Sequence, residues 1–186
     1  MNKINFLSLL IFLAISGIII NEFMPVPEGS EPEWIEIFNN SDSTFTFSKI
    51  YIADAASSKL LPEFKLKSKN YAVITKDTAT LKQLREIPDS TILIQVTLPT
   101  LNNSYDNIII KSAEQIFDSV YYHISYGENG KSFERINPEE PATNKTNLKS
   151  SLNITGATCG FVNSHYVYNK DLKIENFSRI PKTDSI

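Results

Sequence analysis

Apolar and polar residues alternate over many short stretches of this chain, a pattern typical of β-strands. Four apolar residues from Ile92 to Leu98 alternate with polar ones, and Phe45 and Phe47 alternate with Thr and Ser. Because successive side chains of a strand point to opposite faces, each stretch is predicted to bury one face and expose the other. Further strands are predicted over 18–23, 50–54, 64–66, 71–75, 107–111, 116–122 and 133–136.

The stretch from Trp34 to Phe38 is apolar on both faces, since Trp34 and Phe38 would point one way and Ile35 and Ile37 the other. A strand of this kind is typical of a sheet centre with packing on each side. Glu36 would then lie among aromatic residues, so we expect it to need a hydrogen-bonding partner.

One stretch has helical spacing. Asp77 or Thr78 can cap its start, Leu81 and Leu84 recur on one helix face, and Pro88 would end it. The remaining segments are predicted as connections. They are a loop over 55–58, a tight turn over 102–106, a hairpin loop over 112–115, and a surface segment over 137–158 with little periodicity.

The two ends of the chain have a different character from its middle. A short basic start, an apolar run and the small residues Ala14 and Ser16 predict a signal peptide over 1–16, cleaved before Gly17. An uncleaved anchor over 4–20 is the alternative, although that run is short for a bilayer. The charged stretch 166–186 is predicted to be an extension or frayed tail.

Length and charge agree with a single exported domain. The chain has 186 residues and a formal net charge of −3, so nothing in its bulk charge attracts nucleic acid or anionic lipid. We predict an all-β sandwich of about eight or nine strands with one short helix over 18–165, because short strands recur at regular spacing without an internal repeat.

Six short motifs in order along the chain resemble the lamin tail domain family, over residues 18 to about 164. Each is weak alone, and their order gives the resemblance its weight. They are Ile20-Asn21-Glu22-Phe23, Trp34-Ile35-Glu36-Ile37, the stretch 71–77, Leu101-Asn102-Asn103 with Asp106, the stretch 116–120, and the stretch 131–135 together with Gly156-Ala157-Thr158.

The resemblance implies an immunoglobulin-like β-sandwich without shared catalytic machinery. Eukaryotic members of the family are docking surfaces for proteins and chromatin, and exported bacterial members resemble accessory modules. Two departures bear on packing. Lys49-Ile50 stands where bacterial relatives usually have Gly-Trp, and Cys159 stands where they tend to have proline, so the closing turn is expected to be looser.

The residues that could carry chemistry form no recognisable site. His123 and His165 are far apart in the sequence, and no orienting group is marked for a Cys159–His123 pair. We therefore expect no catalytic residue, metal or cofactor, and a partly exposed His123. Cys159 is expected to be buried, with pairing between chains as the alternative. Asp106 is expected to fix its turn by bonding backbone amides, with calcium binding as the alternative.

Positive charge is concentrated between Lys59 and Arg85, after a stretch over 4–48 that has no Lys or Arg. Alternating lysines in a strand would project from one face and could bind an acidic polymer such as extracellular DNA or an acidic glycan. An edge strand protected by lysines against aggregation is the alternative. The candidate binding residues are Lys65, Lys67, Lys69, Lys82 and Arg85.

Together these patterns predict a non-enzymatic module, exported to the periplasm, the cell surface or the medium, with no transmembrane segment after signal cleavage. Its expected role is docking or adhesion to a surface protein or glycan, through loops and one sheet face. Polyanion binding in service of a secreted nuclease or other hydrolase is the alternative. Several tyrosines predicted to be exposed could stack on sugars or pack: Tyr121, Tyr122, Tyr126, Tyr166 and Tyr168.

Overall fold

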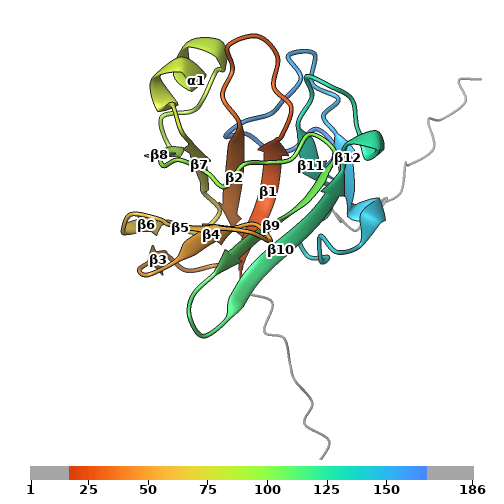
Figure 1. The fold of residues 1–186 in the computed structure, drawn as a ribbon. Helices are drawn as coiled ribbons and strands as arrows, with labels where there is room; N and C mark the ends of the chain where they lie inside the picture. The colour runs from red at the N-terminus through yellow and green to blue at the C-terminus, as the bar shows by residue number, and fades with distance from the viewer. Residues whose placement is uncertain (1–16, 167–186) are drawn as a thin grey trace, which may run out of the picture.

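Two β-sheets packed face to face form the body of the protein in a computed structural model that describes residues 17–166 (Figure 1). The larger sheet has six strands. Their spatial order is β12 (Leu148–Ser150), β11 (Phe133–Arg135), β1 (Ile18–Met24), β2 (Trp34–Asn39), β7 (Tyr71–Thr75) and β8 (Ile92–Gln95).

The second sheet has four strands, and a separate two-stranded ribbon lies at one end of the sandwich. The four-stranded sheet runs in the order β10 (Ile116–His123), β9 (Tyr105–Lys111), β4 (Tyr51–Ala53) and β5 (Ser58–Leu60). The ribbon pairs β3 (Phe45–Phe47) with β6 (Phe64–Leu66). The helices are α1 (Thr78–Leu84) and two short 3-10 turns, Ile124–Tyr126 and Lys145–Asn147.

The helix α1 makes a parallel strand pair possible. Strands β7 and β8 run parallel, with Ile74 opposite Ile94, whereas the other strand pairs of the described residues are antiparallel. Parallel neighbours need a crossover connection, and α1 supplies it between them. Asp77 caps the helix by accepting from the Thr80 N–H at 3.0 Å.

The main core lies between the two sheets. Apolar side chains of β1 and β2, such as Ile20 and Ile35, meet Ile108 and Val120 of the second sheet. These side chains are at most 1% exposed, so the hydrophobic effect of their burial holds the sheets together.

A bulge in β1 is completed by an ion pair that joins the two sheets. The β1–β2 register shifts between Ile20 and Glu22. There the Arg135 Nε donates to the Ile20 carbonyl at 2.9 Å, and the Ile20 N–H donates to Asp118 Oδ2 at 2.7 Å. Arg135 also bonds Asp118 directly, and it is 1% exposed. The backbone groups freed by the bulge therefore have partners from both sheets.

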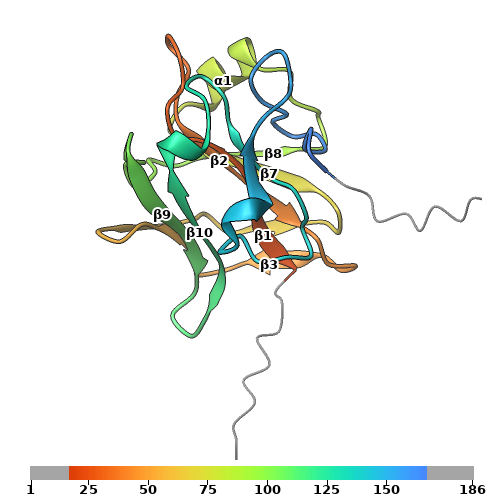
Figure 2. The same ribbon diagram turned by 90° about the vertical axis from the view of Figure 1, so that its right-hand side faces the viewer.

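A second, smaller core covers the outer face of the six-stranded sheet. Trp34 and Val73 point outward from it and pack against Leu81 of α1. Ala157 and Cys159 reach the same cluster from the chain that follows β12. This C-terminal segment lies against the sheet on the side away from β9 and β10 (Figure 2). The molecule therefore has a third, irregular layer on one side.

The prediction of an all-β, immunoglobulin-like sandwich with one short helix is confirmed, with 12 strands in the described residues instead of eight or nine. Two three-residue strands, β5 and β12, were missed because neither is long enough to show a period. The prediction that 137–158 only wraps the surface was wrong in part, since this stretch contains β12 and buries Ala142 and Ala157.

The structure also bears on the predicted strand end at Leu98 and on the departure from the family pattern at Lys49-Ile50. The alternation predicted through Leu98 ends earlier as a strand, because β8 stops at Gln95. Lys49 has a φ of 55°, so a lysine occupies a left-handed position at the site where the resemblance predicts glycine. Ile50 beside it is buried.

The predicted signal peptide over 1–16 lies outside the described residues, and so does all of the predicted extension 166–186 except Tyr166, including Tyr168. Within 17–166, no helix has both the length and the apolar character needed to cross a membrane.

Candidate functional site

Three fully buried glutamates lie side by side on the outer face of the six-stranded sheet. Glu22 of β1 is opposite Glu36 of β2 on one side and opposite Glu134 of β11 on the other. Each of the three is 0% exposed. We call them the glutamate row. Because burial removes water and like charges repel, such a row requires hydrogen-bond donors or retained protons.

The segment 156–165, which we call the strap, crosses the glutamate row and supplies many of these donors. The Thr158 N–H donates to Glu22 Oε1 at 2.8 Å, and the Gly160 N–H donates to Glu36 Oε2 at 2.5 Å. The Ser164 hydroxyl donates to Glu134 Oε2 at 2.7 Å. Each glutamate of the row is thereby bonded to the strap.

Gly160 is required where the strap approaches closest. Its φ is 83°, and a Cβ at this position would lie 2.7 Å from Thr91 Oγ1 and 2.8 Å from Pro88 Cδ. A side chain would therefore push the strap away from the sheet and lengthen the bond to Glu36.

The sheet contributes the remaining donors from residues next to the row. Asn21 Nδ2 donates to Glu36 Oε1 at 2.8 Å, and the Ser132 hydroxyl donates to Glu22 Oε1 at 2.5 Å. Asn163 of the strap bonds the Asn21 backbone carbonyl at 3.0 Å and the Arg135 carbonyl at 2.8 Å. Every buried side-chain polar atom of the described residues has a partner, so the row is built into the fold.

Burial also changes the acidity of the row. It raises the pKa of Glu22 from 4.5 to about 7, against the lowering effect of hydrogen bonds from Ser132 and Thr158. It raises the pKa of Glu36 well above its ordinary value, and the charge of Glu22 adds to the rise. Protons are therefore held here at a pH where surface glutamates are ionised.

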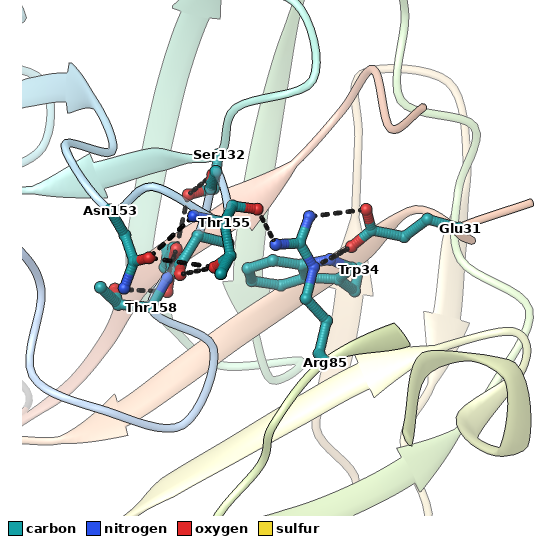
Figure 3. A network of polar contacts seen from close by, with 10 residues as sticks. Glu31, Trp34, Arg85, Ser132, Asn153, Thr155 and Thr158 are labelled. Atoms are coloured by element: carbon teal, nitrogen blue, oxygen red, sulfur yellow. Dashed lines mark hydrogen bonds and ion pairs between the residues drawn. The ribbon is translucent and has the colours of Figure 1, made fainter. Parts of the chain in front are cut away.

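An ion pair between Arg85 and Glu31 fixes the start of the C-terminal segment against the sheet (Figure 3). Arg85 binds Glu31 through two bonds, Nε to Oε1 at 2.8 Å and Nη2 to Oε2 at 2.7 Å. The Trp34 indole N–H also donates to Glu31 Oε1, at 2.9 Å, and Arg85 Nη1 donates to the Thr155 carbonyl. The two charged side chains are 10% and 7% exposed, so this pair is shielded from water and salt.

The predicted basic residues do not form one surface. Lys65 lies in β6 and Lys67 just after it, both exposed. Lys82 lies on α1, away from β6 (Figure 1).

The prediction that alternating lysines share one strand face was wrong, because β6 ends at Leu66. Lys69 has a φ of 57°, donates to Asn40 and lies 3.6 Å from Asp42. Arg85 is bonded to Glu31 and Thr155 and has a structural role there. The involvement of Lys65, Lys67, Lys69, Lys82 and Arg85 in binding stays a prediction.

A row of exposed aromatic rings marks the outer face of the four-stranded sheet. Tyr105 of β9 and Tyr121 of β10 have ring centroids 6.5 Å apart, and Tyr105 stacks with His123 at 6.2 Å. His123 is in turn 5.5 Å from Tyr126, and Lys145 Nζ lies 5.8 Å from the Tyr126 ring. We call Tyr105, Tyr121, His123 and Tyr126 the tyrosine face.

This face is open to solvent. Tyr105 is 58% exposed, Tyr126 45% and Tyr121 39%. Strands β9 and β10 lie at the outside of the molecule, on the side away from the strap (Figure 2). Tyr122, predicted to be exposed, is buried because it points inward from β10, and its hydroxyl donates to the Asn102 carbonyl at 2.8 Å.

A cleft of about 430 Å³ lies at one end of the sandwich, between the β1–β2 loop and the chain from Thr97 to Asn103. Glu33 and Lys76 both line it. Burial raises the pKa of Glu33, while a backbone N–H and the nearby Lys76 act against that rise. Glu31 also lines the cleft, but its carboxylate is bonded to Arg85, so Glu33 and Lys76 are the charged groups that remain for a polar ligand.

The predictions for Cys159, His123 and Asp106 are confirmed. Cys159 is buried, and His123 is partly exposed with its Nδ1 accepting from the Ser125 N–H. Asp106 accepts from the backbone of Asn102 at 3.1 Å and of Asn107 at 2.8 Å, as expected of a residue that fixes its turn.

Among the described residues, no group of three or more His, Cys, Asp or Glu side chains is arranged to hold a metal ion.

The sequence marked only one member of the glutamate row, Glu36, as a residue that needs a partner. Glu22 and Glu134 could have been suspected from their place in apolar strands. Their proximity to Glu36 depends on the register of three strands and on a bulge, which the sequence does not reveal. The tyrosine face was missed as a unit for the same reason.

Comparison with known protein families identifies the sandwich. A family model described as Lamin Tail Domain matches residues 13–123, more than half of the chain. That family consists of immunoglobulin-like, non-catalytic domains of the binding type. No curated protein matches this chain.

Proposed function

This chain belongs to the lamin tail domain family, and we propose that it is an exported, non-enzymatic module that docks at the cell surface or outside the cell through its tyrosine face. The family membership supports recognition over catalysis, because its domains are binding modules. The proposal goes beyond membership in naming the compartment and the surface.

The observation that carries the proposal is the exposure of the tyrosine face. Tyr121, Tyr105 and His123 follow one another on a sheet with a packed core behind it, and Tyr126 continues the row from the 3-10 turn after β10, at ring distances of 5.5 to 6.5 Å. Tyrosine rings give large contact areas at small entropic cost, since each has few rotatable bonds and a polar hydroxyl. A rigid sheet presenting such rings suits the flat face of a sugar or an apolar side chain of a surface protein.

Export is supported by the position of the first strand. Cleavage before Gly17 would leave β1, which begins at Ile18, complete in the mature chain. The carbonyl of Gly17 accepts from the Asn40 N–H at 2.5 Å, so a chain cleaved at that point would have contacts with the fold from its first residue onward.

The test is binding of the chain to an array of surface glycans and to intact cell-surface extract, with and without the double substitution Tyr105→Ala and Tyr121→Ala. We expect the double variant to lose at least about tenfold in affinity, because each lost stacking contact is worth about 1 kcal/mol. Leu84→Ala is the matched control, since Leu84 is 49% exposed but lies on α1. Equal binding by all three proteins would reject the tyrosine face.

The alternative function, polyanion binding beside a secreted hydrolase, rests on Lys65 and Lys67. Both are exposed, and neither has a carboxylate partner within residues 17–166. Binding of a DNA oligonucleotide should then weaken steeply as salt rises, and Lys65→Gln with Lys67→Gln should abolish it. Lys149→Gln, an exposed lysine on β12, is the control. DNA binding that is unchanged by the pair would reject this site.

A further inference from the structure

The hydroxyl of Thr158 lies between two carboxyl groups of the glutamate row. Its oxygen is 3.0 Å from Glu22 Oε2 and 3.0 Å from Glu134 Oε1. A hydroxyl carries a single proton, so it can donate to only one of the two. The other contact is a hydrogen bond only when that carboxyl group is protonated and donates to the Thr158 oxygen.

The hydroxyl of Ser132 adds a second short contact to the row. Its oxygen lies 2.5 Å from Glu22 Oε1, whereas the Gly156 carbonyl, 3.3 Å away, already accepts from the Ser132 N–H at 2.9 Å. Ser132 therefore donates to Glu22, and this bond fits either protonation state of the carboxyl group. The shared hydroxyl of Thr158 is the contact that fits a row that retains a proton and does not fit a fully ionised one.

Little positive charge is available to replace that proton. The titratable groups of other elements around the row and Cys159 are Glu31 of the β1–β2 loop, Arg85 after α1, and His165 of the strap. Arg85 forms its bonds with Glu31 and Thr155, and the side chain of Arg135 turns to Asp118. His165 contacts the Ser150 carbonyl with its ring and reaches Glu134 only through its backbone N–H.

We propose that the strap is a proton-linked clasp, closed while the glutamate row holds a proton and loosened when Glu22 and Glu36 are both ionised. Loss of the proton leaves two carboxylates without solvent on adjacent strands, and it turns one of the two Thr158 contacts from a hydrogen bond into a repulsion between acceptors. Lifting the strap admits water to the row. The same movement exposes Cys159 and uncovers the cluster around Trp34 and Val73.

Cys159 makes this movement measurable, because it is the single cysteine of the chain, lies in the strap and is buried. The experiment measures alkylation of Cys159 in the full chain by N-ethylmaleimide from pH 5 to pH 8.5. Each rate is divided by the rate for the same chain in denaturant at the same pH, which removes the effect of thiol ionisation. Hydrogen exchange of the Thr158 and Gly160 amides, corrected for intrinsic rates, reports the same opening without a reagent.

The expected result is a normalised rate that rises about tenfold per pH unit between about pH 5 and 7 and levels off above. This window follows from the pKa of Glu22, which burial raises from 4.5 to about 7. The amides of Ile35 and Ile37, in the centre of the sheet, exchange only through global unfolding, so they should stay more strongly protected than the amides of Thr158 and Gly160 at every pH. A flat normalised rate, or equal protection of the strap amides and of Ile35 and Ile37, would overturn the clasp.

Neutral variants separate the clasp from other causes. Glu22→Gln should reduce the rise, and the double variant Glu22→Gln with Glu36→Gln should abolish it, because amides do not titrate. Glu114→Gln, an exposed glutamate in the β9–β10 turn, should leave the profile unchanged. If the double variant does not fold, the profile of the unsubstituted chain decides alone; a double variant that folds and keeps the full rise would contradict the proposal.

Discussion

The two outer faces of this sandwich are built on opposite principles. The outer face of the six-stranded sheet is covered by α1 and the strap, and it buries three glutamates together with Trp34. The outer face of the four-stranded sheet has no such layer in the described residues, and it presents tyrosines to solvent. Carboxyl groups are thus buried on one face, while large aromatic groups are exposed on the other.

This contrast separates the groups that hold the fold together from the groups that are free to bind a ligand. The buried carboxyl groups have partners within the fold, and their hydrogen bonds hold the strap against the sheet. The rings of the tyrosine face contact mainly one another, which leaves their outward faces available to a ligand. Perturbed acidity therefore marks the closed face, and exposed apolar area marks the face that is open to recognition.

The largest effect on the free energy of unfolding should follow from removing a buried ring on the covered face. Trp34→Ala removes a 0% exposed indole ring and its bond to Glu31, so we expect a loss of about 3–5 kcal/mol in the free energy of unfolding. Urea denaturation followed by far-UV circular dichroism measures it. Trp34→Phe keeps most of the volume and should lose less, and a loss below 1 kcal/mol for Trp34→Ala would show that the third layer contributes little.

A change of pH should affect the covered face, where the glutamate row lies. Because burial raises the pKa of Glu22 to about 7, the folded chain binds more protons than the unfolded chain between about pH 4.5 and 7. The free energy of unfolding should therefore fall as pH rises through this window, by on the order of 3 kcal/mol. Asp77, whose pKa is lowered by the Thr80 N–H, acts in the opposite direction only at more acidic pH.

Denaturation midpoints at pH 5, 6, 7 and 8 measure this dependence, and Glu22→Gln should flatten it. A free energy of unfolding that rises from pH 5 to 7 would contradict protonated glutamates on the covered face.

Removing the shared hydroxyl should have an intermediate effect. Thr158→Val keeps the shape of the side chain but takes away the group that contacts both Glu22 and Glu134. We expect a loss of about 1–3 kcal/mol, since buried carboxyl oxygens are left without a partner. Thr158→Ser, which keeps the hydroxyl, is the matched control in the same denaturation experiment. Equal losses in both variants would point to packing of the methyl group instead.

The smallest effect on stability should come from the open face. Tyr121→Ala removes a ring that is 39% exposed, so the free energy of unfolding should change by only about 0.5 kcal/mol. Tyr122→Ala is the contrasting neighbour, because its 0% exposed ring packs against Phe23 at 5.2 Å. Thermal denaturation of the two variants compares them, and similar losses would show that Tyr121 supports the fold.

Much of the architecture could be predicted from local pattern. The alternation in 107–111 and 116–122, the doubly apolar stretch at Trp34 and the cap at Asp77 each gave an element that the structure contains. The strands β5 and β12 could not be found in this way, because three residues form a strand only when a neighbour pairs with them. The alternation of Lys65, Lys67 and Lys69 misled because the chain leaves the strand at Leu66.

The sequence by itself determined which stretches can form strands and which face of each strand is apolar. It also showed that an acidic residue lies inside a buried strand. These properties depend on neighbours along the chain, and backbone geometry imposes the period of two. Only the tertiary structure decided that Glu22, Glu36 and Glu134 form a row, that the strap bonds to it, and that Tyr105 meets Tyr121 and His123. Those contacts depend on strand register and on segments more than 100 residues apart, such as Glu22 and Thr158, which only packing brings together.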